Sequence, residues 1–283
     1  MQVSIRNLYA GYSLSKKEKN IVIEDLTTTF ESSKWHFITG ISGCGKSTFI
    51  ETLSFLIPKI SGDILFDDVL IENNKKSLKY FRDNSAIMLQ YTDRQFFNNT
   101  VEEEIVFNLK RNNEDKTVIK KKLFEVLELL NIDKKLLLKS PFEISGGEKR
   151  MIALASVIIS SPKILFLDEP TVGLDFESKN RFMNVLYSLN KDYHTTIIQS
   201  SHILEDIVEY GDSVFILNNN KEFIKGCPHE LLFSSSILDK FNLQRTDIHY
   251  YIEELENLGV ININSNIKTK KDLVSKLFYN KEC

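Results

Sequence analysis

The feature that most constrains this chain is a nine-residue stretch near its N-terminus. Residues 40–48 read Gly-Ile-Ser-Gly-Cys-Gly-Lys-Ser-Thr and fit the pattern G-x-x-x-x-G-K-[ST]. A buried strand is predicted before this stretch, over 35–39, and a helix after it, over 49–56, which is the context that a phosphate-binding loop requires. The candidates for contact with a nucleotide are Gly40, Ile41, Ser42, Gly43, Cys44, Gly45, Lys46, Ser47 and Thr48.

The residue types in this loop suit phosphate chemistry. Glycine lets backbone N–H groups approach phosphate oxygens without a Cβ in the way, and the following helix points its positive end at the same anion. Lys46 is expected along the β- and γ-phosphates, and the Ser47 hydroxyl on Mg²⁺. Cys44 lies between two glycines and is expected to be exposed when the site is empty. The alternative is a chance glycine-rich turn, which the Lys-Ser pair and the strand and helix around it disfavour.

A second stretch carries two carboxylates. Residues 163–170 read Lys-Ile-Leu-Phe-Leu-Asp-Glu-Pro, which predicts a central parallel strand that delivers Asp168 and Glu169 at its C-terminal end. In a nucleotide-hydrolysing site Asp168 would hold Mg²⁺ through its hydration shell, and Glu169 would orient or deprotonate the attacking water. A solvated acidic strand end is the alternative.

Composition narrows the function classes. The chain has 283 residues, of which 42% are hydrophobic, so it can bury an α/β core and carry a smaller appendage. Its net charge of −3 gives no electrostatic footprint for nucleic acid, and no nucleic-acid partner is expected. No apolar run approaches the roughly 20 residues needed to cross a bilayer, so a membrane role is expected only through a partner. The cysteines Cys44, Cys227 and Cys283 are far apart and fit reduced thiols.

The N-terminal region predicts an antiparallel β subdomain. Residues 3–12 and 21–30 read as its first strands, and a hairpin follows near 63–68. Tyr12 lies near the turn of this region, where its ring could stack on an adenine, although packing is the commoner use of such an aromatic. The short apolar strand 86–90 ends in Gln90, whose side chain is expected at a strand terminus; a solvated loop residue is the alternative.

Helical spacing dominates the middle of the chain, from about residue 101 to 159. Near its end Ser145, Gly146 and Gly147 precede a helix predicted from about 149 to 160, so that they form either an anion site or a simple N-cap. Strand 195–199 ends near His202, a hairpin follows over 214–224, and short amphipathic helices over 247–258 and 270–278 predict a C-terminal unit with its own core.

Taken in order, these motifs resemble the ATP-binding cassette (ABC) ATPases. The resemblance makes Gln90 the Q-loop residue, a metal and catalytic contact; Ser145, Gly146, Gly147 the signature; Asp175 the D-loop residue; and His202 the switch histidine. Residues 89–97 and the pair Thr100-Val101 are similar to the Q-loop of the energy-coupling factor (ECF) subfamily, the A-components EcfA, and the C-terminal helices resemble the tail of those proteins. Departures are Thr92 and Asp93 in the Q-loop, and Ile144, Glu148 and Met151 around the signature. Glu148 would place a negative charge near a bound γ-phosphate.

The resemblance implies an α/β fold with a P-loop NTPase (RecA-like) core, an antiparallel β subdomain, a helical subdomain insert at about 93–160 and a small C-terminal helical extension. It divides the chain into an ABC ATPase domain over 1–227 and the extension over 228–283. It implies ATP and Mg²⁺ as ligands and a head-to-tail pair of ABC ATPase subunits, identical or paralogous. It further implies an ECF-type importer for a vitamin or a transition-metal ion, with integral-membrane T- and S-components, and a peripheral place on the cytoplasmic face of the cell membrane. The alternatives are a subunit of another ABC transporter and a soluble ABC ATPase acting on ribosomes or DNA.

Overall fold

The computed structural model describes the chain except for residues 14–18, 92–94, 261–269 and 279–283. Thr92 and Asp93 of the expected Q-loop, and Cys283, therefore lie outside the described residues. The chain divides into two compact units, residues 1–34 with 47–200 and residues 35–46 with 201–283. Each unit is described by itself below, and the boundary expected at residue 227 stays a prediction.

An antiparallel sheet opens the first unit, as the sequence predicts. Its strand order is β2-β1-β4-β5, and its members are β1 (Val3–Ser13), β2 (Lys19–Phe30), β4 (Ser61–Phe66) and β5 (Val69–Leu70). Strand β1 pairs with both β2 and β4. The β4–β5 turn uses Asp67 and Asp68 at positive φ, a conformation that Asp tolerates in tight turns.

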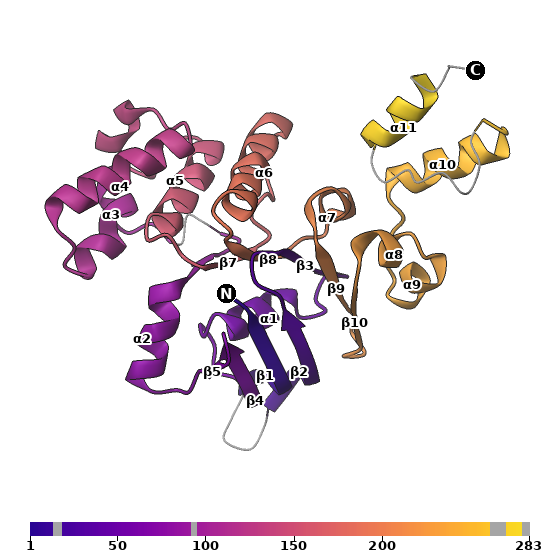
Figure 1. The fold of residues 1–283 in the computed structure, drawn as a ribbon, viewed down its shortest axis with the longest axis horizontal. Helices are drawn as coiled ribbons and strands as arrows, with labels where there is room; N and C mark the ends of the chain where they lie inside the picture. Colours follow the sequence, from indigo (N-terminus) through magenta and orange to yellow (C-terminus); the bar gives the residue numbers. More distant parts are fainter. Residues whose placement is uncertain (14–18, 92–94, 261–269, 279–283) are drawn as a thin grey trace. The chain divides into compact units, whose positions relative to one another are not determined.

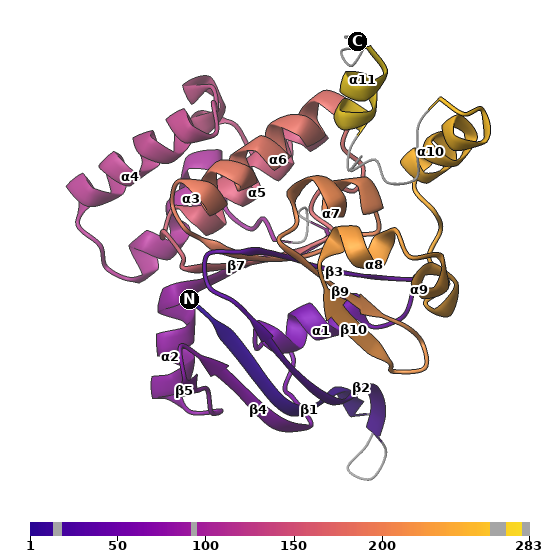
Figure 2. The same cartoon turned by 45° about the vertical axis from the view of Figure 1, so that its right-hand side comes forward.

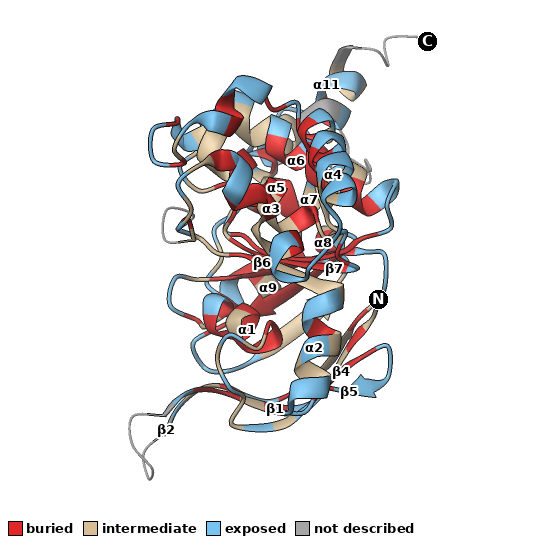
Figure 3. Cartoon of the chain, turned by 90° about the vertical axis from the view of Figure 1, so that its left-hand side faces the viewer, coloured by how far each residue is buried: buried red, intermediate tan, exposed pale blue. Residues whose placement is uncertain are grey.

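The strand that ends in the two carboxylates lies between two parallel neighbours in the same unit. Strand β7 (Ile164–Asp168) pairs with β6 (Ser85–Met88) on one side and with β8 (Thr196–Ser200) on the other. All five residues of β7 are buried, as a central strand requires, and β7 is drawn in the colour of buried residues in Figure 3. The register places Asp168 directly opposite Ser200, so polar groups meet at the C-terminal ends of neighbouring strands.

The predicted helical insert is present and consists of α3 (Val101–Arg111), α4 (Lys116–Leu129), the 3₁₀ turn η2 (Lys134–Leu138) and α5 (Gly146–Ile158). Helices α3, α4 and α5 lie side by side (Figures 1 and 2). Thr100 caps α3 by accepting the Glu103 N–H at 3.2 Å, and acidic residues in the first turn and basic residues in the last favour the helix dipole. Helix α5 begins at Gly146 rather than near 149, because Ser145 caps it.

The first unit also contains α2 (Lys75–Asn84), α6 (Phe176–Lys191) and, from Ser47 on, α1 (Lys46–Leu53). Helix α2 was not predicted from the sequence, since Phe81 is its one buried residue. The Phe81 ring lies 5.0 Å from the rings of both Phe55 and Phe66, and Phe66 contacts Phe166 of β7 at 6.5 Å between ring centroids. This aromatic cluster joins the antiparallel sheet to the parallel strands.

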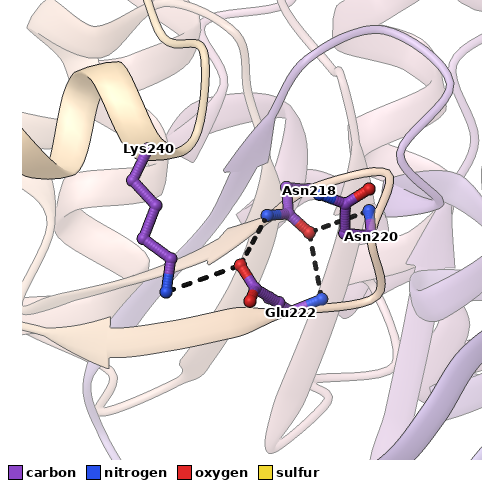
Figure 4. A network of polar contacts seen from close by, with 4 residues as sticks. All are labelled: Asn218, Asn220, Glu222 and Lys240. Carbon is purple, nitrogen blue, oxygen red and sulfur yellow. Dashed lines mark hydrogen bonds and ion pairs between the residues drawn. The ribbon is translucent and has the colours of Figure 1, made fainter.

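The second unit holds a parallel pair of strands and a hairpin. Strand β3 (Trp35–Gly40) runs parallel to β9 (Ser213–Leu217), and β10 (Phe223–Gly226) pairs antiparallel with β9, as predicted for 214–224. Asn218 fixes the hairpin turn, since its Oδ1 accepts the Asn220 and Glu222 N–H groups at 3.0 Å each and its Nδ2 donates to Glu222 at 3.0 Å (Figure 4). Lys240, at the end of α9 (Ser235–Lys240), lies 3.5 Å from the same carboxylate (Figure 4).

Helices complete the second unit: α7 (Leu204–Tyr210), which was not predicted, α8 (Pro228–Leu232), α9 (Ser235–Lys240), α10 (Asp247–Asn257) and α11 (Lys270–Phe278). The predicted C-terminal core exists: Ile248 and Leu273 are buried against Phe233, Ile252, Leu255 and Leu277. Among the described residues, none of the helices is both long and apolar enough to cross a membrane.

Candidate active site

The loop between β3 and α1 has the geometry of an anion cradle. Gly43 and Gly45 adopt φ values of +82° and +104°, which only glycine takes readily. A Cβ added to Gly43 would meet no described atom within 4 Å, so the space beside the loop is open. The Lys46 ammonium is buried and donates to the carbonyls of Gly40 at 2.9 Å and Ile41 at 3.1 Å, so it lies across the loop. The loop therefore presents a fixed positive charge and a space that fits a phosphate group.

Cys44 corrects one expectation: it is 4% exposed rather than exposed. The tight turn, in which the Cys44 N–H donates to the Ile41 carbonyl at 3.3 Å, directs the thiol toward Gly40. A Cβ on Gly40 would lie 2.7 Å from the Cys44 sulfur and 2.2 Å from the Leu217 carbonyl oxygen, so glycine is required there. Burial raises the pKa of the Cys44 thiol, against the opposing effect of the Lys46 charge, so the group stays protonated at neutral pH.

Tyr12, on β1, lies beside the first turn of α1. Its hydroxyl is 3.1 Å from the Thr48 hydroxyl, while the residue stays 43% exposed. The tether holds the ring beside the first turn of α1 and leaves part of the ring open to solvent. Stacking on an adenine stays a prediction.

Asp168 and Glu169 end β7 and are both held by Ser200 of β8. The Ser200 hydroxyl donates to Asp168 Oδ1 at 2.6 Å and accepts the Glu169 N–H at 2.8 Å. Glu169 adopts φ +42°, a conformation that costs energy for a residue with a Cβ and that recurs at active sites as well as in turns. Ser200 was missed by the sequence analysis, although its position at a neighbouring strand end was a signal for it.

Gln90 follows β6 by two residues and is brought to Glu169. Its Nε2 lies 3.4 Å from Glu169 Oε2. The amide and the carboxylate therefore share one local site at the ends of β6 and β7, which fits a pair that would position a water molecule.

The residues present fit Mg²⁺ only if a nucleotide completes its coordination. No group of three His, Cys, Asp or Glu side chains that could hold a metal occurs among the residues that the structure describes. Asp168 is buried with one oxygen engaged by Ser200, and Ser47 is exposed at the first turn of α1. Mg²⁺ commonly takes one or two protein oxygens and completes its shell with phosphate oxygens and water, which matches this donor set. Burial raises the pKa of nearby Glu51, and the Asp168 charge adds to the rise.

Ser145, Gly146 and Gly147 lie at the start of α5, and Ser145 is the N-cap of this helix. The Ser145 hydroxyl accepts the Glu148 N–H at 3.3 Å, and the Glu148 carboxylate accepts the Ser145 N–H at 2.8 Å, which makes a capping box. A cleft of about 590 Å³ opens beside it, and Gly173, Asp175 and Ser178 are among its lining residues. Asp175 caps α6 by accepting the Ser178 N–H at 2.9 Å, which lowers the pKa of its carboxyl group.

The structure thus brings candidate residues of the first unit together in three places: Tyr12 with Thr48, Gln90 with Glu169, and the signature residues with Asp175. His202 is exposed two residues beyond β8 and belongs, with Lys46, to the second unit. The approach of Lys46 and His202 to Glu169 stays a prediction.

Comparisons with known proteins show the family of this chain. A family model described as ABC transporter matches residues 23–172. The chain is 32% identical to the energy-coupling factor transporter ATP-binding protein EcfA3 of Oenococcus oeni, over 98% of this chain and 96% of that protein. It is 33% identical to the corresponding EcfA2 of Clostridium perfringens, over 95% of this chain and 94% of that protein.

Solved structures extend the likeness to the fold. The structure of cbiO1 from Clostridium perfringens, part of the ABC transporter complex cbiONQ, aligns with a TM-score of 0.74 and 27% identity over 89% of this chain and 98% of that one. The ATP-binding cassette MJ0796, solved bound to ADP and Pi, aligns at 0.69 with 21% identity over 79% of this chain and 98% of that one, which supports the fold alone. The expected α/β P-loop NTPase fold is confirmed. The chain belongs to the ABC transporter ATPases and, among them, to the ATP-binding subunits of energy-coupling factor transporters.

Proposed function

We propose that this ATPase energises an ECF-type importer that takes up a vitamin or a transition-metal ion through a membrane T-component and a substrate-binding S-component. The observation that carries the proposal is the extent of the match, because relatives named as ECF transporter subunits align over 98% of the chain, the C-terminal helices included. In this reading the protein is peripheral, on the cytoplasmic face of the membrane, and its extension over 228–283 is a functional part of the subunit.

The phosphate loop holds the nucleotide. Backbone N–H groups of residues 40–48 surround the phosphates, and Lys46 turns from the Gly40 and Ile41 carbonyls toward the β- and γ-phosphate oxygens. Tyr12 stacks on the adenine while Thr48 keeps its hydroxyl in place. Ser47 and Asp168 would hold Mg²⁺, with Gln90 as a further contact, and the bound ion would neutralise charge on the phosphates.

Glu169 activates the attacking water. Its backbone is fixed by Ser200, and its carboxylate lies beside the Gln90 amide, so a water molecule bridging them is positioned by both. His202 contacts the γ-phosphate, so its position depends on whether that phosphate is present. Ser200 acts through the two carboxylates as a positioning residue.

A second ATPase subunit completes the site. Two subunits pack head to tail, so that Ser145, Gly146 and Gly147 of one face the nucleotide held by Lys46 of the other, with Asp175 beside that interface. The exposed cleft that already joins 145–148 to Asp175 supports this use. Closure on ATP and opening after hydrolysis then drive the membrane partner.

The membrane partner docks near Gln90 and the helical insert at about 93–160. Tyr91 and Phe97 are 59% and 62% exposed there, and the Phe97 ring packs edge-on against Phe107 of α3 at 4.6 Å. Exposed aromatic side chains held against a helix are typical of a protein interface. Movement of Gln90 by the nucleotide would thus reach the same surface.

The test is phosphate release by the complex co-purified from membranes. Glu169→Gln keeps the shape of the side chain and removes the base, so turnover falls by about 10²-fold or more while ATP still binds. Turnover within a few-fold of the natural chain contradicts the role of Glu169. Co-purification of ribosomes in place of a small integral-membrane protein contradicts the transport assignment and favours a soluble ABC ATPase.

A further inference from the structure

Glu148 occupies an unusual place in the signature helix. Its Oε2 accepts two hydrogen bonds from the same residue, one from the Ser145 N–H at 2.8 Å and one from the Ser145 hydroxyl at 2.7 Å. The Glu148 N–H in turn donates to the Ser145 hydroxyl oxygen at 3.3 Å. The signature serine is therefore bound on both sides by one neighbour on the next turn of the chain.

This arrangement uses the one proton that the serine hydroxyl has. A phosphate oxygen accepts hydrogen bonds and donates none at neutral pH, so Ser145 can bind a phosphate only as a donor. While its proton points at Glu148, the hydroxyl offers a phosphate only its lone pairs. The capping box has to open, at least in its side-chain part, before Ser145 can contact a nucleotide.

Charge strengthens the hold on Ser145. The hydrogen bonds from the Ser145 side chain and backbone lower the pKa of Glu148, and the charges of Lys139 and Arg181 lower it further, so the group is a carboxylate at neutral pH. Hydrogen bonds to an ionised acceptor are about twice as strong as neutral ones. Arg181 also donates to the Leu130 carbonyl at 2.6 Å, so its guanidinium is shared with the end of α4. A phosphate that enters this cleft to reach Ser145 therefore meets the carboxylate of Glu148, which is hydrogen-bonded to that serine.

We propose that Glu148 sets the ATP affinity of the composite site by holding the Ser145 hydroxyl and by repelling the γ-phosphate of the nucleotide bound to the facing subunit. The inference rests on the proposed function, in which Ser145 faces that nucleotide. A glutamine at 148 can keep the capping box, because its carbonyl oxygen also accepts, but it is uncharged and releases the serine more easily. The natural chain therefore closes only at higher ATP concentration than the same chain with glutamine.

The experiment measures the MgATP concentration at half-maximal closure of the complex co-purified from membranes, with Glu169→Gln as the background that prevents hydrolysis. Adding Glu148→Gln is expected to lower this concentration by about tenfold, the difference between a charge-assisted and a neutral hydrogen bond. Adding Ser145→Ala to that pair is expected to remove most of the gain, since the released hydroxyl is then absent.

The matched control is Glu143→Gln, which removes the same charge from an exposed glutamate two residues before Ser145. It is expected to change the half-maximal concentration by less than twofold. If Glu148→Gln does no more than Glu143→Gln, or raises the concentration needed, the inference is overturned. Ser145→Arg in the same background separates the two proposals: normal closure of that variant refutes the head-to-tail site itself, whereas blocked closure with no effect of Glu148→Gln refutes only the role of Glu148.

Discussion

Two helices of this ATPase begin where a phosphate is expected, and they satisfy their first N–H groups differently. At α1 the loop supplies glycines at positive φ, open space beside Gly43, and a lysine that donates to carbonyls of its own loop. At α5 a serine and a glutamate satisfy each other in a capping box. The first start offers donors to an anion, whereas the second already holds one in the form of Glu148.

The difference separates the tasks of the two sites. A helix start that holds its own carboxylate is complete in the isolated subunit and has to exchange that group for an outside ligand. A glycine loop with a buried ammonium is arranged for a ligand from the beginning. We therefore expect the isolated subunit to bind ATP through α1 alone, with α5 contributing only when two subunits meet.

Ser145→Arg tests this division most severely. The arginine places bulk and charge where the facing γ-phosphate is expected, so ATP-driven dimerisation should fall by about 10²-fold or more, whereas ATP affinity of the isolated subunit should stay within twofold. Light scattering on the Glu169→Gln background measures dimerisation, and calorimetric titration measures affinity. If the Ser145→Arg variant dimerises at the same ATP concentration as the chain with the natural serine, Ser145 is only a helix cap.

Lys46→Ala is the reciprocal change. Loss of a charge-assisted contact should weaken ATP binding by the isolated subunit by about 10- to 100-fold. Lys149→Ala makes the same change in the first turn of α5 and should leave the affinity within twofold. Equal losses from the two variants would mean that α5 contacts nucleotide within a single subunit.

Cys44 sharpens the description of the α1 loop. Its thiol is buried and its pKa is raised, whereas Cys227 is exposed. Maleimide should therefore label Cys44 in the nucleotide-free protein at least about tenfold more slowly than Cys227, since a buried protonated thiol is a poor nucleophile. Peptide mass spectrometry over time gives both rates, and similar rates would show that the loop opens readily without nucleotide.

The smallest expected effect is a pH dependence of stability that comes from the capping box of Ser145 and Glu148. Because the pKa of Glu148 is lowered in the folded protein, its contribution to the free energy of unfolding is present above its ordinary value of 4.5 and is lost as the pH falls through the lowered pKa. Glu148→Gln should destabilise the protein by roughly 0.5 kcal/mol near pH 7, and the difference should vanish in acid. Thermal unfolding from pH 7 to 3 checks this, with Glu143→Gln as control; a constant difference would place the carboxylate outside the box.

The sequence predicted the parts of the site that depend on residue type and order. Gly40 to Thr48, the Asp168-Glu169 strand end and the helical insert follow from glycine, charge and apolar spacing. The orientation of Cys44 could not be predicted, because the variable positions of the loop pattern do not specify which way a side chain turns. Helix α2 escaped detection because it is short and mostly polar, with Leu78, Tyr80 and Phe81 as its only apolar side chains.

Contacts between residues far apart in the sequence also could not be predicted. Ser200 acts on Asp168 and Glu169 only because two strands far apart in sequence lie in register. Glu148 was a different case, since the spacing Ser-x-x-Glu was visible and predicts a capping box, yet it was interpreted only as a charge near the nucleotide.

Gly40 and Gly146 are required for different reasons. A side chain at 40 would collide with the Leu217 carbonyl oxygen, so folding itself demands the glycine. A Cβ at 146 would meet no described atom within 4 Å, so the fold of one subunit leaves room for a larger residue there. If the signature faces a nucleotide on the partner subunit, as proposed above, the need for Gly146 comes from the assembled pair and not from the fold of one subunit. A duplicate of this chain that stopped pairing would be free to lose Gly146 in the course of evolution while still keeping Gly40.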